Sequence, residues 1–185
     1  MRGDKIAFLL CRSIPANVHF LGVFARNQIP PSRIHSVQYP ECYVVNSDDS
    51  SSPGQHWLAV FISSDGILEF FDSYGLPAHF YNIRVSAYRS NSTQIQADNS
   101  TTCGHYCIAY LCARSLGFSL TDFLNSFTYC YASNDRFVTK WIRSLTCAIV
   151  IPIFHHCFKC LAPNHTCTLR SKQTAFHHLY WQKIK

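Results

Sequence analysis

The stretch QADNSTTCGHYCIAYLCARSLG, residues 96–117, decides the fold because it joins a polar loop to a long apolar run. The loop residues favour turns. The run from Gly104 is apolar almost all round, which predicts a central, buried helix of about three and a half turns. Gly117 is placed to cap the end of this helix. Cys103 therefore lies where the loop meets the start of the helix.

A second pattern, upstream of this stretch, predicts a β-hairpin. The runs HWLAVFIS (residues 56–63) and ILEFF (residues 67–71) are rich in strand-forming residues. They flank an Asp-Gly pair at residues 65–66, which is a favoured hairpin turn. Pairing of the two strands brings His56, at the start of the first, close to Asp72, which follows the second.

Shorter signals predict the remaining elements. These are a short helix within residues 1–16, a strand or loop at 20–31, a strand at 41–46, a helix capped by Ser119 and Asp122, and a helix capped by Asn134. We expect an α+β fold, with a central mixed sheet of about five strands packed against helices.

Composition divides the chain into a domain at residues 1–146 and a basic tail at residues 147–185. Hydrophobic residues make up 48% of the chain and charged residues 14%, which suits a packed core and excludes a disordered chain. The first part has 11 lysine and arginine residues against 10 acids, a net charge of +1, and the tail has 5 and no acid. Any contact with nucleic acid is therefore expected to be weak and to involve the tail.

The tail also contains the zinc candidates Cys157, Cys160, His165 and Cys167. The C-x2-C pair suits zinc, but the H-x-C spacing is shorter than structural sites use. We therefore expect no metal and no cofactor. We interpret the tail as an extension that is poorly ordered or not part of the domain.

The cysteines and apolar runs bear on localisation. Ten cysteines, several on helix faces that should be buried, fit a reducing compartment. The first apolar run has six residues, shorter than the ~7–15 of a signal peptide, and the run at 147–154 is too short to span a bilayer. We expect an intracellular monomer of the cytoplasm, the nucleus or a virus-like particle, without a membrane partner.

Four residues together indicate nucleophilic catalysis. A thiol attacks as its thiolate, which a helix N-terminus and a neighbouring imidazolium both favour, and Cys103 can have both if His56 faces it. Asp72 can orient the imidazole, and Gln96, seven residues before the cysteine, can donate to an oxyanion beside the Cys103 N–H. Each residue alone is common in structural roles. His105 is excluded as the base because positions i and i+2 of a helix do not face each other.

In this order, the segments GQHWLAVF, FFDSYG and QADNSTTCGHYCIAYLCARSLG resemble the adenovirus-type cysteine proteases (adenain-like, clan CE). The closest resemblance is to the proteases of Maverick/Polinton transposons and related viruses, over about residues 5–145. It implies an adenain-like fold, with Cys103 as nucleophile, His56 as general base, Asp72 as its orienting acid and Gln96 in the oxyanion hole. It also implies polypeptide substrates, namely capsid or other structural precursors.

Two departures and two alternatives accompany this resemblance. No cysteine lies between Cys42 and Cys103, so activation by a disulfide-linked viral peptide is not expected, and the near-neutral domain does not favour activation by DNA. Proteases of ubiquitin-like modifiers in the same clan have Asp before the cysteine and a shorter Gln-to-Cys spacing, whereas this chain has Thr102. The second alternative is a non-catalytic, transposon-derived binding module, which the four intact residues disfavour.

Overall fold

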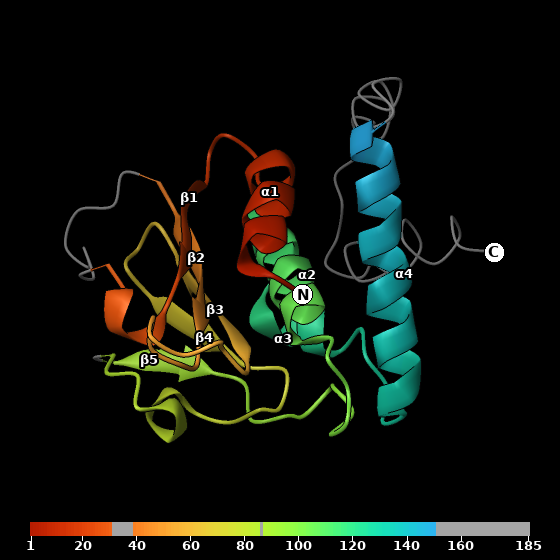
Figure 1. The fold of residues 1–185 in the computed structure, drawn as a ribbon. Helices are drawn as coiled ribbons and strands as arrows, with labels where there is room; N and C mark the ends of the chain where they lie inside the picture. The colour runs from red at the N-terminus through yellow and green to blue at the C-terminus, as the bar shows by residue number, and fades with distance from the viewer. Residues whose placement is uncertain (31–38, 86, 151–185) are drawn as a thin grey trace.

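A five-stranded mixed sheet forms the centre of the protein, and helices cover one of its faces (Figure 1). The computed structural model describes residues 1–30, 39–85 and 87–150. The elements are α1 (Gly3–Ser13), β1 (His19–Phe24), η1 (Arg26–Gln28), β2 (Glu41–Asn46), β3 (Trp57–Ile62), β4 (Leu68–Phe71), η2 (Ala78–Tyr81), β5 (Tyr88–Ser90), α2 (Cys103–Ser115), α3 (Leu120–Leu124) and α4 (Tyr131–Val150).

The strands follow one another across the sheet in chain order, β1-β2-β3-β4-β5. The outer pairs, β1 with β2 and β4 with β5, are parallel, and the inner pairs are antiparallel. The α+β class and the five-stranded mixed sheet are therefore confirmed. The predicted hairpin is β3–β4, and Gly66 takes a positive φ of 80° in its turn.

Side chains of the central strands alternate between two apolar layers. Val44, Ala59 and Phe61 face the helices, whereas Val45 and Leu58 face the opposite side, where η2 and neighbouring loops cover them. Both faces are covered, so β2 and β3 are buried almost throughout.

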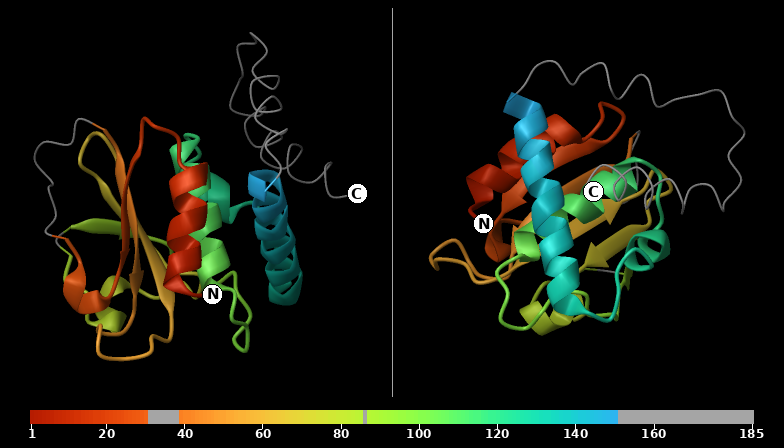
Figure 2. Two further views of the ribbon diagram at one scale, coloured as in Figure 1. Left: turned by 45° about the horizontal axis from the view of Figure 1, so that its top comes forward. Right: turned by 90° about the vertical axis from the view of Figure 1, so that its right-hand side faces the viewer.

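Helix α2 lies between the sheet and α4, and α1 lies beside it (Figure 2). Its position between two layers explains why its sequence is apolar nearly all round, with Tyr106, Ile108, Tyr110 and Leu111 fully buried. The predicted cap at Gly117 is present, with a φ of 86° that suits glycine.

The helices after α2 agree with one cap prediction and correct another. Ser119 and Asp122 form the predicted capping box of α3. The prediction that Asn134 caps the last helix is wrong, because α4 begins before it, at Tyr131. The Asn134 side chain is buried and binds Thr128 and the Ile95 carbonyl. It therefore serves tertiary packing and not the first amides of the helix.

The predicted domain boundary at residue 146 falls within α4, and the tail beyond residue 150 lies outside the described residues. Among the helices that the structure describes, none combines the length and the apolar character needed to cross a membrane.

A buried ion pair joins β4 to α2. The Arg114 guanidinium donates to both carboxylate oxygens of Glu69, at 2.7 and 3.2 Å, and the Tyr110 hydroxyl donates to the same carboxylate at 2.9 Å. The guanidinium also lies over the Phe61 ring, 4.6 Å from its centroid. These contacts fix the helix against the sheet at the end opposite Cys103.

Replacing Glu69 by alanine should lower the free energy of unfolding by about 3–5 kcal/mol, because Arg114 would remain buried without its partner. Urea unfolding followed by circular dichroism measures this loss. The matched control is Asp49→Ala, which breaks the more exposed Arg26–Asp49 pair and should cause a much smaller loss. Equal losses in the two variants would contradict this assignment.

Candidate active site

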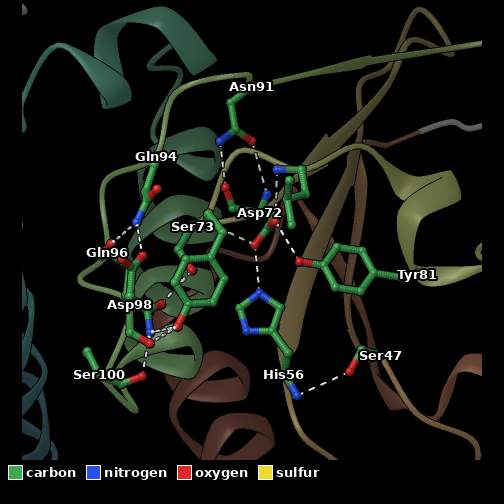
Figure 3. Close-up of polar contacts among 12 residues, drawn as sticks. Ser47, His56, Asp72, Ser73, Tyr81, Asn91, Gln94, Gln96, Asp98 and Ser100 are labelled. Carbon is green, nitrogen blue, oxygen red and sulfur yellow. Dashed lines mark hydrogen bonds and ion pairs between the residues drawn. The ribbon is translucent and has the colours of Figure 1, made fainter.

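Three of the four residues predicted for catalysis meet where α2 begins against the sheet. His56 directly precedes β3, Asp72 directly follows β4, and Cys103 is the first residue of α2. The antiparallel pairing of β3 with β4 brings His56 and Asp72 side by side (Figure 3). Ser47 exchanges two hydrogen bonds with the His56 backbone and fixes the start of β3.

Asp72 is fully buried and its carboxylate accepts four hydrogen bonds. His56 Nε2 lies 2.6 Å from Oδ1, and the Tyr74 N–H donates to the same oxygen. Oδ2 accepts from the Leu76 N–H and, at 2.8 Å, from the Tyr81 hydroxyl. A buried carboxylate needs such partners to remain charged, and together they hold it in one orientation towards His56.

The turn after Asp72 is shaped by a close approach of two chain segments. The Asn91 side chain binds both the N–H and the carbonyl of Asp72. Gly75 has a φ of 74°, and a Cβ there would lie 2.9 Å from the backbone carbonyl carbons of Ser92 and Thr93. Only glycine fits this position, so the turn and the loop that leads to Gln96 can pack together.

His56 and Cys103 lie next to each other, and each shifts the pKa of the other. Because Asp72 occupies Nε2, the ring nitrogen that remains for the Cys103 thiol is Nδ1. Burial by itself lowers the pKa of His56, but the hydrogen bonds to Asp72 and Cys103 outweigh it and raise this pKa to about 9. Burial likewise raises the pKa of Cys103, but the bond to His56 and its charge outweigh it and lower this pKa below its ordinary value. The geometry therefore favours a thiolate–imidazolium pair.

The N-terminus of α2 supports the thiolate. Hydrogen bonding from the backbone N–H groups of Trp57 and Gly104 adds to the lowering of the Cys103 pKa. Thr102, the N-cap residue, makes no side-chain cap bond, and its hydroxyl donates to Asp135 at 3.0 Å. The His105 N–H bonds to the Thr102 carbonyl, whereas the Cys103 and Gly104 N–H groups receive no side-chain cap from Thr102, and their partial positive charge lies at the sulfur.

Two tyrosines that the sequence analysis did not single out enclose the imidazole. Tyr74 stacks on the His56 ring with centroids 4.9 Å apart, and Tyr81 stacks at 5.6 Å. Tyr74 belongs to the DSYG turn, so its proximity to Asp72 was a signal in the sequence. Nothing in the sequence distinguishes Tyr81, which η2 brings back to the site.

Gln96 lies in the same neighbourhood and is fully buried. Its Oε1 accepts from the Ser73 hydroxyl at 2.7 Å, and its Nε2 donates to the Ser100 carbonyl at 2.8 Å and to the Tyr74 hydroxyl at 3.1 Å. Figure 3 shows Gln96 between the Ser73 turn and the Ser100 loop. Gln96 is thus connected to His56 through Tyr74, whose hydroxyl binds Gln96 and whose ring stacks on the imidazole.

The first turn of α4 holds the loop that carries Gln96. Asn134 donates to the Ile95 carbonyl, and Asp135 accepts from the Thr102 and Tyr106 hydroxyls at 3.0 and 2.9 Å. These contacts join residues far apart in the chain, so no local sequence pattern could reveal them.

Two further expectations concern residues beside this arrangement. Burial lowers the pKa of His105 to about 4, so this ring is neutral near pH 7. The zinc candidates Cys157, Cys160, His165 and Cys167 lie outside the described residues. Within residues 1–30, 39–85 and 87–150, no group of three or more side chains is arranged to hold a metal ion.

Comparison with solved structures finds several likenesses, including the following two. A crystal structure of the ASFV pS273R protease matches 60% of this chain and 44% of its own length, with 22% sequence identity and a TM-score of 0.38. The central domain of an uncharacterized protein from Legionella pneumophila matches 79% of this chain and 97% of the domain, with 15% identity and a TM-score of 0.48. No protein-family model and no curated protein matches the sequence. The chemistry of the site is therefore the basis for its function.

Iodoacetamide should label Cys103 faster than the exposed Cys130 at about pH 7, although Cys103 is only 7% exposed. The reason is its lowered pKa, which keeps the thiolate populated below the usual Cys value of about 8.5. His56→Ala leaves burial to raise that pKa, so the labelling should slow strongly at pH 7 and much less at pH 10. Mass spectrometry of each cysteine peptide measures both rates, and a loss independent of pH would contradict the ion pair.

Asp135→Ala should loosen the loop at residues 96–102, because the Thr102 and Tyr106 hydroxyls lose their acceptor. Hydrogen exchange of the loop amides should accelerate, and iodoacetamide should label Cys103 more slowly. Ser133→Ala, on the exposed side of the same helical turn, is the matched control and should change neither quantity. Unchanged exchange in Asp135→Ala would show that the loop holds its conformation without α4.

Proposed function

We propose that this protein is a cysteine endopeptidase that hydrolyses peptide bonds through a thioester acyl-enzyme. The observation that carries the proposal is the arrangement at the start of α2, where the Asp72 carboxylate lies 2.6 Å from the His56 ring and His56 lowers the pKa of the neighbouring Cys103. A lowered thiol pKa, a base beside it and a buried carboxylate that orients the base are what nucleophilic acyl transfer requires.

In the proposed reaction the Cys103 thiolate adds to the carbonyl carbon of the scissile peptide bond. The oxyanion that forms accepts a hydrogen bond from the Cys103 N–H, in the first turn of α2, and from a donor on the Gln96 side of the site. The His56 imidazolium gives its proton to the leaving amine. Water, deprotonated by His56, then hydrolyses the thioester and restores the thiolate.

The proposed substrates are polypeptides, and no cofactor takes part. The resemblance in sequence extends this proposal to capsid or other structural precursor proteins, cut at sites that contain small residues such as glycine. The protein is proposed to act as an intracellular monomer.

Digestion of a peptide library derived from a whole proteome tests the activity. The wild-type protein should create new N-termini at a restricted set of sites, and Cys103→Ser and His56→Ala should lower the rate by at least about 10³-fold. Cys130→Ser is the matched control and should cut at the wild-type rate. Cleavage that survives in Cys103→Ser would refute the proposal.

The same assay separates the proposed function from its relative in clan CE. Precursors of ubiquitin-like modifiers that end in diglycine are added alongside the peptide library. Cleavage confined to these precursors would favour a modifier protease, whereas cleavage of the library without the precursors supports the endopeptidase.

A further inference from the structure

The amide of Gln96 has no N–H donor left for a substrate. A primary amide has two N–H donors, and here they go to the Ser100 carbonyl and the Tyr74 hydroxyl. The Gln96 side chain is also fully buried, so a substrate oxygen cannot touch it in this conformation. Gln96 could donate to an oxyanion only by giving up one of these partners.

Tyr74 stands between Gln96 and the rest of the site. Its ring stacks on the His56 imidazole with an interplanar angle of 27°, and its hydroxyl accepts the Gln96 Nε2–H. Unlike Gln96, this side chain is only half-buried, so its hydroxyl can meet a bound substrate.

The proton of the Tyr74 hydroxyl is weakly engaged. Its acceptor within the described part of the chain is the Asp98 carbonyl, at 3.4 Å, where a strong O–H···O bond measures about 2.7–2.8 Å. Burial and the negative charge of Cys103 raise the pKa of Tyr74, so the phenol keeps its proton. Because its bond to the Asp98 carbonyl is weak, the Tyr74 hydroxyl can exchange this bond for one to an oxyanion at a small cost in free energy.

We propose that the Tyr74 hydroxyl is a catalytic residue, the side-chain donor of the oxyanion hole, and that Gln96 is the positioning residue behind it. Ser73 orients the Gln96 amide through Oε1, and Gln96 fixes the Tyr74 oxygen through Nε2. Hydrogen bonds in such a chain strengthen one another, so each donation makes the Tyr74 proton a better donor. This inference rests on the proposed acyl transfer at Cys103.

Two small reagents distinguish a loss of oxyanion stabilisation from a loss of thiolate reactivity. Iodoacetamide is displaced by the thiolate without any oxyanion. With p-nitrophenyl acetate, the Cys103 thiolate adds to the carbonyl carbon and the C=O electron pair moves onto oxygen. This oxyanion accepts from the Tyr74 hydroxyl and the Cys103 N–H until the pair returns and expels p-nitrophenolate. An acetyl thioester then remains on Cys103.

Tyr74→Phe should lower the rate of Cys103 acetylation by about 10²-fold or more and leave the rate of alkylation near that of the wild type. Unchanged alkylation also shows that the variant is folded with its ion pair intact. Tyr81→Phe is the matched control, since Tyr81 stacks on the same imidazole but donates to Asp72. It should change both rates together and leave their ratio unaltered.

Each other outcome overturns the inference in a recognisable way. If Gln96 itself is the oxyanion donor, Tyr74→Phe frees the Gln96 N–H, and the rate of acetylation stays equal or rises. This result would refute the role of Tyr74 but leave the proposed function of Cys103 intact. If Cys103 is not labelled ahead of the other cysteines, the proposed function and this inference both fail. Should Tyr74→Phe not fold, 3-fluorotyrosine at position 74, a stronger donor, must raise the ratio of acetylation to alkylation. An unchanged ratio refutes the inference.

Discussion

The buried carboxylate of Asp72 is the group on which the site depends. Its four donors come from the start of β3, from the turn after β4 and from η2, so these segments must all be in place before the charge is satisfied. Leaving a buried carboxylate with missing partners is unfavourable by several kcal/mol, which makes partial assembly unstable. The orientation of His56 is therefore a consequence of the whole hairpin and its following loop.

The start of α2 lacks a stabilising N-cap hydrogen bond at the position where the nucleophile lies. A Thr at the N-cap usually accepts from an amide of the first turn and stabilises a helix by about 1 kcal/mol. Thr102 makes no such bond, its hydroxyl donates to Asp135, and the Gly104 N–H helps to lower the Cys103 pKa. The contact with Asp135 ties the start of α2 to α4, so the lost cap is partly offset by tertiary structure.

Local patterns in the sequence predicted the elements and the pairing of His56 with Asp72, because strand alternation and an Asp-Gly turn determine the register of a hairpin. They failed at Asn134, whose position in the sequence is that of a cap but whose amide is drawn into the core by Ile95 and Thr128. They also missed Tyr81, since its role depends on a loop that returns to the site. Contacts of this kind arise from tertiary folding and have no local signature.

The base side and the oxyanion side of the proposed site are held by different parts of the fold, and Tyr74 contacts both. The base side rests on the sheet through Asp72, and the oxyanion side rests on α4 through the loop that carries Gln96. Tyr74 belongs to both, since it stacks on His56, accepts from Gln96 and donates its own backbone N–H to Asp72. A shift of the turn that carries Tyr74 therefore alters the imidazole and the oxyanion donor together. This explains why the glycine that closes the turn, Gly75, must fit so tightly against the Gln96 loop.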